Sequence, residues 1–292
     1  MSVHLRHHRS AASFLASASA LLEATEAENN LLVGVALELN RDPSRHSNPN
    51  TLVTVHKPDG TCTAALLRTP PYGAVVTEAG PEDVAALVAD LKSLLPSLHE
   101  VLAPRATAFA FASAWTAPWS GSPTVLLEMR VYRLEAVQSS DRAPPSGRLR
   151  LALHSDHPLL TRWVEAFHEE VGLPLHGAPT EVARRLVEDG ATWLWDDAGR
   201  PVSLVCSQGE TLRGVRISMV YTPPGDRGRG YASAAVSDTC RHVLASGKRM
   251  CLLFADEANA TSNAIYKRLG FVEVARFAHV LLGSPAARRP GE

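Results

Sequence analysis

Two arginines and two glycines stand immediately before a predicted helix, in the stretch from residue 227 to residue 232. They are Arg227, Gly228, Arg229 and Gly230, followed by Tyr231 and Ala232. Glycines at a helix N-terminus let the backbone approach a ligand closely. The unpaired N–H groups of the first turn and the positive end of the helix dipole favour a phosphate there. The stretch therefore predicts a phosphate-binding loop, although a plain turn with two solvated arginines would have the same residues.

A second group of polar residues lies about thirty residues further on. Asn259 falls in a predicted turn, and Asn263 and Tyr266 are three residues apart on one face of a short predicted helix. Gly270 is typical of a helix C-terminus. Taken alone, Tyr266 is best interpreted as a half-buried core tyrosine and Asn259 as a turn residue that caps the helix.

The elements that position these residues can be read from the hydrophobic pattern. Residues 215–221 alternate in strand period, and Pro223 and Pro224 end the strand because proline lacks the N–H donor. Residues 233–245 favour a helix, and the apolar run 249–254 favours a buried strand. The predicted order is therefore strand, glycine loop, helix, strand, asparagine-bearing turn, tyrosine-bearing helix and strand.

This arrangement resembles the GNAT superfamily of acyl-CoA-dependent N-acyltransferases, over roughly residues 150–282. The pyrophosphate loop of that family, Arg/Gln-x-x-Gly-x-Gly/Ala, is matched by Arg227, Gly230 and Ala232. Its later block, an Asn, six residues, a Tyr and then Leu-Gly-Phe, is matched by Asn259, Tyr266, Leu269, Gly270 and Phe271.

The resemblance implies an α+β protein whose mixed, mostly antiparallel sheet is splayed and flanked by helices. It implies acetyl-CoA as cofactor, coenzyme A as product, and Tyr266 as the acid that protonates the departing thiolate. A backbone N–H near Val220 would polarise the thioester carbonyl. The residues expected to bind the cofactor are Val220, Tyr221, Thr222, Arg227, Gly228, Arg229, Gly230, Tyr231, Ala232, Asn259 and Asn263.

The general base is not identified by the sequence. The carboxylates and the imidazole available are those of Glu26, Glu28, Glu210, Asp256, Glu257 and His279. Each is more readily explained as an ordinary surface group, and a base acting through water is an alternative.

Composition limits the class of protein. The formal net charge is −1 and the pI about 6.9, so no general attraction to nucleic acid or to a membrane is expected. Four scattered cysteines and twelve histidines without ligand spacing indicate a cytoplasmic protein without a metal site. The expected partner is a small-molecule or peptide amine, acetylated by a monomer or homodimer.

Two other functions remain open at this point. One is a non-catalytic acyl-CoA-binding sensor or partner-binding module, against which an intact loop beside Tyr266 argues. The other is a transferase that takes its acyl group from a carrier such as tRNA, against which the neutral pI and the pyrophosphate loop argue.

The N-terminal half gives a weaker pattern of the same kind. One amphipathic helix is expected over residues 11–32, a hairpin over 51–67, a helix over 81–95 and a strand over 125–134. Residues 138–147 have linker composition, so a boundary is expected between 145 and 146. Residues 1–145 then resemble a GNAT-like lobe without the cofactor loop, or form an unrelated α/β lobe, and residues 146–292 form the catalytic domain.

Overall fold

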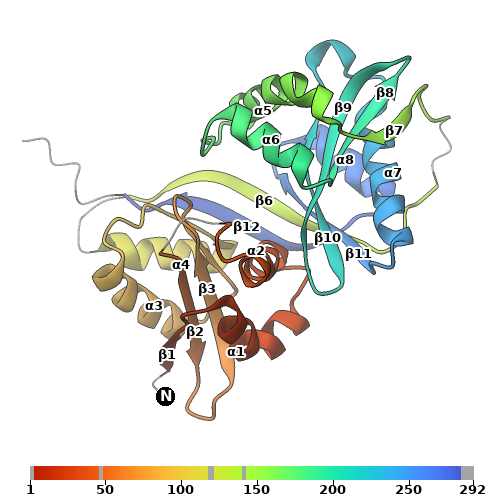
Figure 1. Cartoon of the computed structure of the whole chain (residues 1–292). Helices are drawn as coiled ribbons and strands as arrows, with labels where there is room; N and C mark the ends of the chain where they lie inside the picture. The colour runs from red at the N-terminus through yellow and green to blue at the C-terminus, as the bar shows by residue number, and fades with distance from the viewer. Residues whose placement is uncertain (1–2, 46–48, 118–121, 140–142, 284–292) are drawn as a thin grey trace, which may run out of the picture. The chain divides into compact units, whose positions relative to one another are not determined.

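The computed structural model describes residues 3–45, 49–117, 122–139 and 143–283. The chain divides into two compact units (Figure 1). The first takes in Met1–Val131, Asp256–Ala258 and Val274–Glu292, and the second Tyr132–Ala255 and Asn259–Glu273. Two long strands, β6(Thr124–Leu134) and β12(Val272–Leu281), contribute residues to both units. Each compact unit is made of segments that are separate in sequence. This division therefore does not test the domain boundary expected between residues 145 and 146, which remains a prediction.

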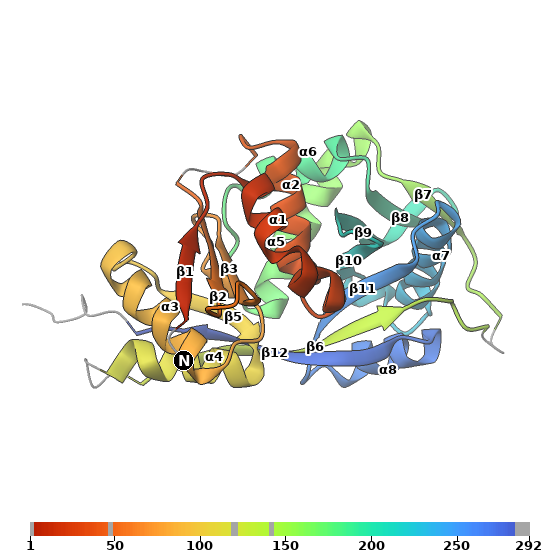
Figure 2. The ribbon, with the colours of Figure 1, turned by 90° about the horizontal axis from the view of Figure 1, so that it is seen from below.

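The described part of the first unit contains five further strands and four helices. They are β1(His4–His7), α1(Ala11–Ala24), α2(Asn30–Arg41), β2(Thr51–His56), β3(Cys62–Arg68), β4(Ala74–Val76), α3(Pro81–Leu94), β5(Glu100–Pro104) and α4(Arg105–Thr116). The strand order is β1-β2-β3-β4-β5-β12, in which only β4 and β5 are parallel. Helices α1 and α2 cover one face of these strands, and α3 and α4 the other (Figure 2).

The single helix expected over residues 11–32 is wrong. Two helices form instead, because the chain turns between Thr25 and Asn29. The Thr25 hydroxyl donates to the carbonyl of Leu21 at 2.7 Å, and the Asn29 amide donates to the Thr25 hydroxyl at 2.8 Å. These side chains satisfy backbone groups at the end of α1 and so end it. The expected hairpin, the helix near residues 81–95 and the strand near 125–134 are confirmed.

The second unit holds the sequence motifs. Its remaining elements are β7(Arg148–Leu151), η2(His154–Asp156), α5(His157–Val171), α6(Pro179–Glu188), β8(Thr192–Asp197), β9(Arg200–Glu210), β10(Gly214–Tyr221), η3(Pro224–Asp226), α7(Tyr231–Ala245), β11(Met250–Asp256) and α8(Ala260–Leu269). The strand order is β11-β10-β9-β8-β7, with β10 and β11 parallel and the other pairs antiparallel.

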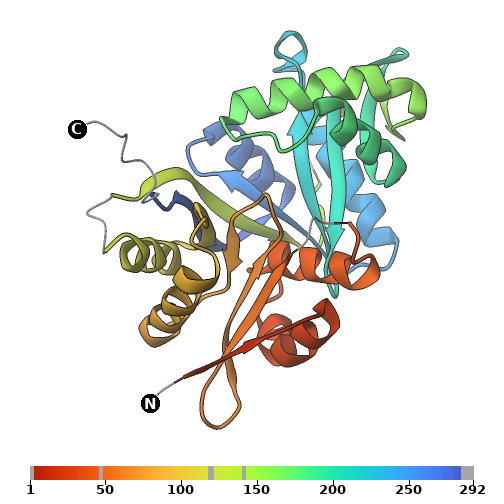
Figure 3. The same ribbon diagram turned by 60° about the vertical axis from the view of Figure 1, so that its left-hand side comes forward.

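Two hydrophobic layers hold this unit together. Helices α5 and α6 pack on one face of β8–β10, and α7 packs on the opposite face (Figure 3). Along β9, Leu204 and Cys206 belong to the first layer, while Val205 between them belongs to the second. This alternation is the period of a strand buried on both faces.

Each half of the chain therefore has the same element order: a strand, two helices, three strands, a helix, a strand, a helix and a final strand. The expectation of two lobes of one fold in tandem is confirmed. Among the described residues, no helix is long and apolar enough to cross a membrane, and no group of three or more His, Cys, Asp or Glu side chains could hold a metal ion.

Candidate active site

The strands β10 and β11 separate along their length. Their residues pair from Gly214 with Met250 to Arg216 with Leu252, and the described register ends there. The other edge of β10 has an irregularity between Ser218 and Tyr221, where Met219 takes a φ of 47°. A positive φ is uncommon for a residue with a side chain and is concentrated at functional sites. The backbone near Val220 is thus turned out of the regular ladder beside the opening between the strands.

The glycine loop follows at the end of β10. Gly228 and Gly230 have φ values of 76° and 85°, and Gly230 is the N-cap of α7. A Cβ atom would meet nothing within 4 Å at Gly228, and at Gly230 only Pro145, at 3.9 Å. Backbone strain, and not crowding, therefore selects glycine here. The first turn of α7 contains no acidic residue, so no carboxylate of that turn competes with an anion for its N–H groups and the helix dipole.

Two interactions hold this loop against β9 and β8. Arg200 donates two hydrogen bonds of 2.8 Å to the carboxylate of Asp226, which closes the turn just before the loop. The Tyr231 hydroxyl donates to Asp197 at 2.5 Å, just after the loop. The hydrogen bonds from Arg200 lower the pKa of Asp226, which keeps its carboxylate charged. The loop is fixed at both ends, as a preformed anion site requires.

Arg227 does not extend freely into solvent. Its Nη2 lies 2.7 and 2.6 Å from the two carboxylate oxygens of Glu170, at the end of α5. Its Nε donates to the carbonyl of Thr222 at 2.8 Å, and its guanidinium lies 5.9 Å from the ring centre of Tyr221. The side chain of Arg229 is 58% exposed, with Asp226 at 3.9 Å. The two arginines therefore differ, since only Arg227 is held in a fixed position.

The two asparagines have different surroundings. Asn259 is exposed, and its side-chain oxygen caps α8 by accepting from the Ser262 N–H at 3.0 Å. Asn263 is buried, accepts a 2.9 Å hydrogen bond from Tyr132 and donates at 2.8 Å to the carbonyl of Asn259. The capping role expected of Asn259 is confirmed. A direct contact of Asn263 with the cofactor remains a prediction, and its geometry favours holding Asn259 in place.

Tyr266 lies in the core between α7, α8 and the strands, and is 7% exposed. Its ring centre is 6.2 Å from that of Tyr132 and 5.7 Å from that of Phe271. Burial raises the pKa of Tyr266, and the nearby Cys240 raises it further. The phenol is therefore protonated throughout the neutral range, as an acid must be before it donates. Its role as the acid is a proposal.

Most of the candidate bases have partners. Glu257 pairs with Arg130 and with Arg276, at 2.8 and 3.2 Å. His279 pairs with Glu100 at 3.0 Å. Glu210 pairs with Lys248 at 3.4 Å, and Asp256 accepts a hydrogen bond from the backbone N–H of Ala258 at 2.8 Å. Glu26 is buried at 2% exposure. For these groups the structure favours structural roles, and Glu28 stays a partly buried group in the turn between α1 and α2.

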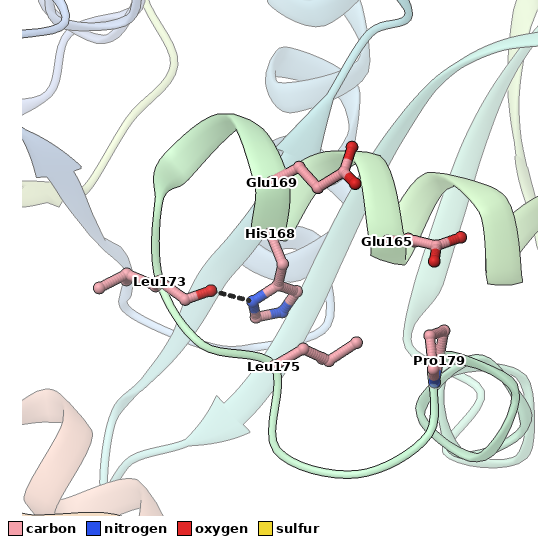
Figure 4. Close-up of a pocket in the computed structure, with 6 residues that line it drawn as sticks. All are labelled: Glu165, His168, Glu169, Leu173, Leu175 and Pro179. Atoms are coloured by element: carbon pink, nitrogen blue, oxygen red, sulfur yellow. Dashed lines mark hydrogen bonds between the residues drawn. The ribbon is translucent and has the colours of Figure 1, made fainter.

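A hollow of about 300 Å³ lies beside α5, under the segment that joins α5 to α6 (Figure 4). Glu165, His168 and Glu169 line it from the helix, and Leu173, Leu175 and Pro179 from the other side. His168 donates from Nδ1 to the carbonyl of Leu173 at 3.4 Å, which leaves Nε2 as an acceptor. Burial lowers the pKa of His168, as does the nearby His176. The sequence analysis missed this histidine, although the i, i+3, i+4 spacing of the polar residues on α5 was a usable signal.

Two sequence comparisons match part of the chain. Residues 202–280 match the family model described as FR47-like protein. A stretch of 90 residues is 34% identical to N-alpha-acetyltransferase MAK3 of Arabidopsis thaliana, which is 30% of this chain and 47% of that protein. The chain thus spans about half the length of the curated relative it matches, and the family model includes the loop, Asn259 and Tyr266.

The fold is shared with solved structures over almost the whole chain. A GCN5-related N-acetyltransferase from Sphaerobacter thermophilus is 19% identical, with a TM-score of 0.61 over 96% of this chain and 95% of that one. The chain therefore has the fold of GNAT acetyltransferases. A Drosophila protein has a TM-score of 0.69 at 13% identity, covering 95% and 98% of the two chains. A tandem GNAT protein from the clavulanic acid biosynthesis pathway has a TM-score of 0.54 at 11% identity, covering 96% and 99%.

The tandem GNAT structure agrees with the two-lobed organisation. At such low identity the three solved structures establish the fold and carry no information about the acceptor. The resemblance predicted from the loop and from the block around Tyr266 is confirmed at the level of the superfamily.

Proposed function

We propose that this GNAT protein is an N-acetyltransferase that moves an acetyl group from acetyl-CoA to a primary amine of a small molecule or peptide by direct transfer. The observation that supports the proposal is the geometry of the glycine loop. Gly228 and Gly230, at positive φ, open the N-terminus of α7 directly after the strand that separates from β11. A pyrophosphate and an extended amide chain would both find backbone partners there.

Each part of the site then has a task. Acetyl-CoA supplies the acyl group as a reactive thioester. The N–H groups of residues 228–232 hold the pyrophosphate, and Asn259 hydrogen-bonds the pantetheine arm through its side-chain nitrogen, which has no partner among the described residues. The backbone N–H near Val220 stabilises negative charge on the carbonyl oxygen as the amine nitrogen attacks.

Tyr266 completes the transfer by giving its proton to the departing sulfur. The attacking nitrogen must be neutral beforehand and must lose a second proton afterwards. Burial lowers the pKa of His168 beside the α5–α6 hollow, and the carboxylates of Glu165 and Glu169 there would attract an ammonium ligand. We assign the base to no residue, because water can relay the proton.

A coupled assay tests the proposal. The protein is incubated with acetyl-CoA and a panel of primary amines and N-terminal peptides, free thiol is followed, and products are weighed by mass spectrometry. Thiol release that requires the amine, together with an acetylated product, is expected. Binding of acetyl-CoA without turnover on any amine would favour the alternative, a non-catalytic acyl-CoA-binding sensor.

A further inference from the structure

The end of α5 carries negative charge where a helix disfavours it. Glu165, Glu169 and Glu170 lie in its last two turns, where the helix dipole repels anions. Glu165 and Glu169 also lie four residues apart on one face, so they repel each other. Helix stability therefore gives no reason for these residues, and the reason must lie in what they contact.

Glu170 has such a contact, whereas Glu165 and Glu169 make no hydrogen bond or ion pair among the described residues. Both Glu170 oxygens bond one nitrogen of Arg227, at 2.7 and 2.6 Å. Arg227 is the first residue of the loop that we propose to bind pyrophosphate, so this inference rests on the proposed function. The carboxylate of Glu170 is thus already paired with the guanidinium that the pyrophosphate would bind.

We propose that Glu170 is a positioning residue that competes with the pyrophosphate for Arg227. In this structure, Glu170 and the Thr222 carbonyl hold the guanidinium, while Nη1 has no partner among the described residues. On binding, the pyrophosphate takes over the guanidinium and Glu170 is released. Because this ion pair must break first, coenzyme A binds more weakly than it would if Arg227 were unpaired.

The size of the effect follows from the exposure of the pair. The side chains of Arg227 and Glu170 are 48% and 42% exposed. Solvent-exposed pairs contribute modestly to the free energy, so breaking this one should weaken binding by roughly two- to fivefold. The ring of Tyr221, packed against Trp163 and Phe167, keeps the guanidinium over one fixed surface.

The chain offers a matched control. Glu169 is adjacent to Glu170 and carries the same charge, but it has no ion pair with Arg227. Glu170→Gln and Glu169→Gln therefore remove the same general repulsion of an anionic ligand, and only Glu170→Gln also frees Arg227. The difference between the two variants isolates the competition.

The test is isothermal titration of coenzyme A into the full chain, repeated in an Arg227→Gln background. Glu170→Gln should bind roughly two- to fivefold more tightly than Glu169→Gln, and the difference should vanish without Arg227. Equal affinities of the two single variants, or weaker binding by Glu170→Gln, would overturn the competition but leave the proposed function intact. If the unmodified chain does not bind coenzyme A, both the competition and the proposed function are wrong.

Discussion

At the scale of single residues, Tyr266 has an unusual combination of properties for a core side chain. Its ring packs as a structural tyrosine would, yet its hydroxyl makes no hydrogen bond among the described residues. The hydroxyl oxygen is not one of the fully buried side-chain atoms that lack a hydrogen-bond partner. It is therefore available to the departing sulfur, as we propose.

Tyr266→Phe should lower kcat by about 10- to 100-fold. A thiolate is a fairly good leaving group, so the benefit of protonating it lies near the low end for acid catalysis. The free energy of unfolding should change by less than about 1 kcal/mol, since no hydrogen bond is lost. Steady-state kinetics and urea unfolding give the two values.

Tyr132→Phe is the control, because it removes a hydroxyl that bonds Asn263 in the same core cluster. It should reduce stability by about 0.5–1.5 kcal/mol and leave kcat within about threefold. If chemistry is rate-limiting and Tyr266→Phe keeps the parent kcat within about twofold, Tyr266 is a core residue only.

At the scale of elements, strands and helices with a clear hydrophobic period were predictable, and so was the loop–helix junction at residue 230. The break between α1 and α2 was not, because it depends on side-chain hydrogen bonds of Thr25 and Asn29 that no periodicity reveals. The pairing of β12 with β5 could not be predicted either, because it joins segments about 175 residues apart. Likewise, nothing in the spacing of Glu170 and Arg227 indicates that they meet.

The β5–β12 pairing is supported by a buried ion pair whose effect depends on pH. His279 lies 3.0 Å from Glu100, and its hydrogen bond lowers the pKa of Glu100 from the ordinary 4.5 to about 2. The Gly73 N–H also donates to this carboxylate, at 2.8 Å. A depressed carboxyl pKa stabilises the folded state above the unfolded pKa, and this contribution is lost as pH falls toward 2.

Glu100→Gln should therefore lower the free energy of unfolding by about 1–3 kcal/mol at pH 7. The deficit should shrink steadily between pH 4.5 and pH 2, where the native carboxylate becomes protonated as well. Urea unfolding of both proteins across this range measures the deficit. A deficit that does not change with pH would show that the charge of Glu100 contributes nothing.

At the scale of the whole molecule, the two lobes share an element order but differ where an anion would bind. In the first unit, Asp83 accepts from the Gly80 N–H at 3.2 Å and from the Thr63 hydroxyl at 2.9 Å. Pro81 removes another N–H donor from the same helix start. The N-terminus of α3 therefore already has its own carboxylate, whereas that of α7 has none.

One molecule of coenzyme A should consequently bind per chain. Isothermal titration of the full-length protein gives the stoichiometry directly. A stoichiometry of two would mean that the Asp83 carboxylate can be displaced and that both lobes bind the cofactor.

The central claim is that acetyl-CoA binds at the glycine loop before α7. Its most direct test is the shift in melting temperature that acetyl-CoA causes in the unmodified chain, in Gly230→Glu and in Gly247→Glu. Gly247 also has a positive φ, 94°, and open space around it, but follows the opposite end of α7. Both substitutions place a side chain at a positive φ, and the helix dipole disfavours the added charge only at Gly247, so Gly247→Glu should lower the melting temperature at least as much. We expect acetyl-CoA to raise the melting temperature clearly in the unmodified chain and in Gly247→Glu, and not in Gly230→Glu. An equal shift in a folded Gly230→Glu variant would contradict it.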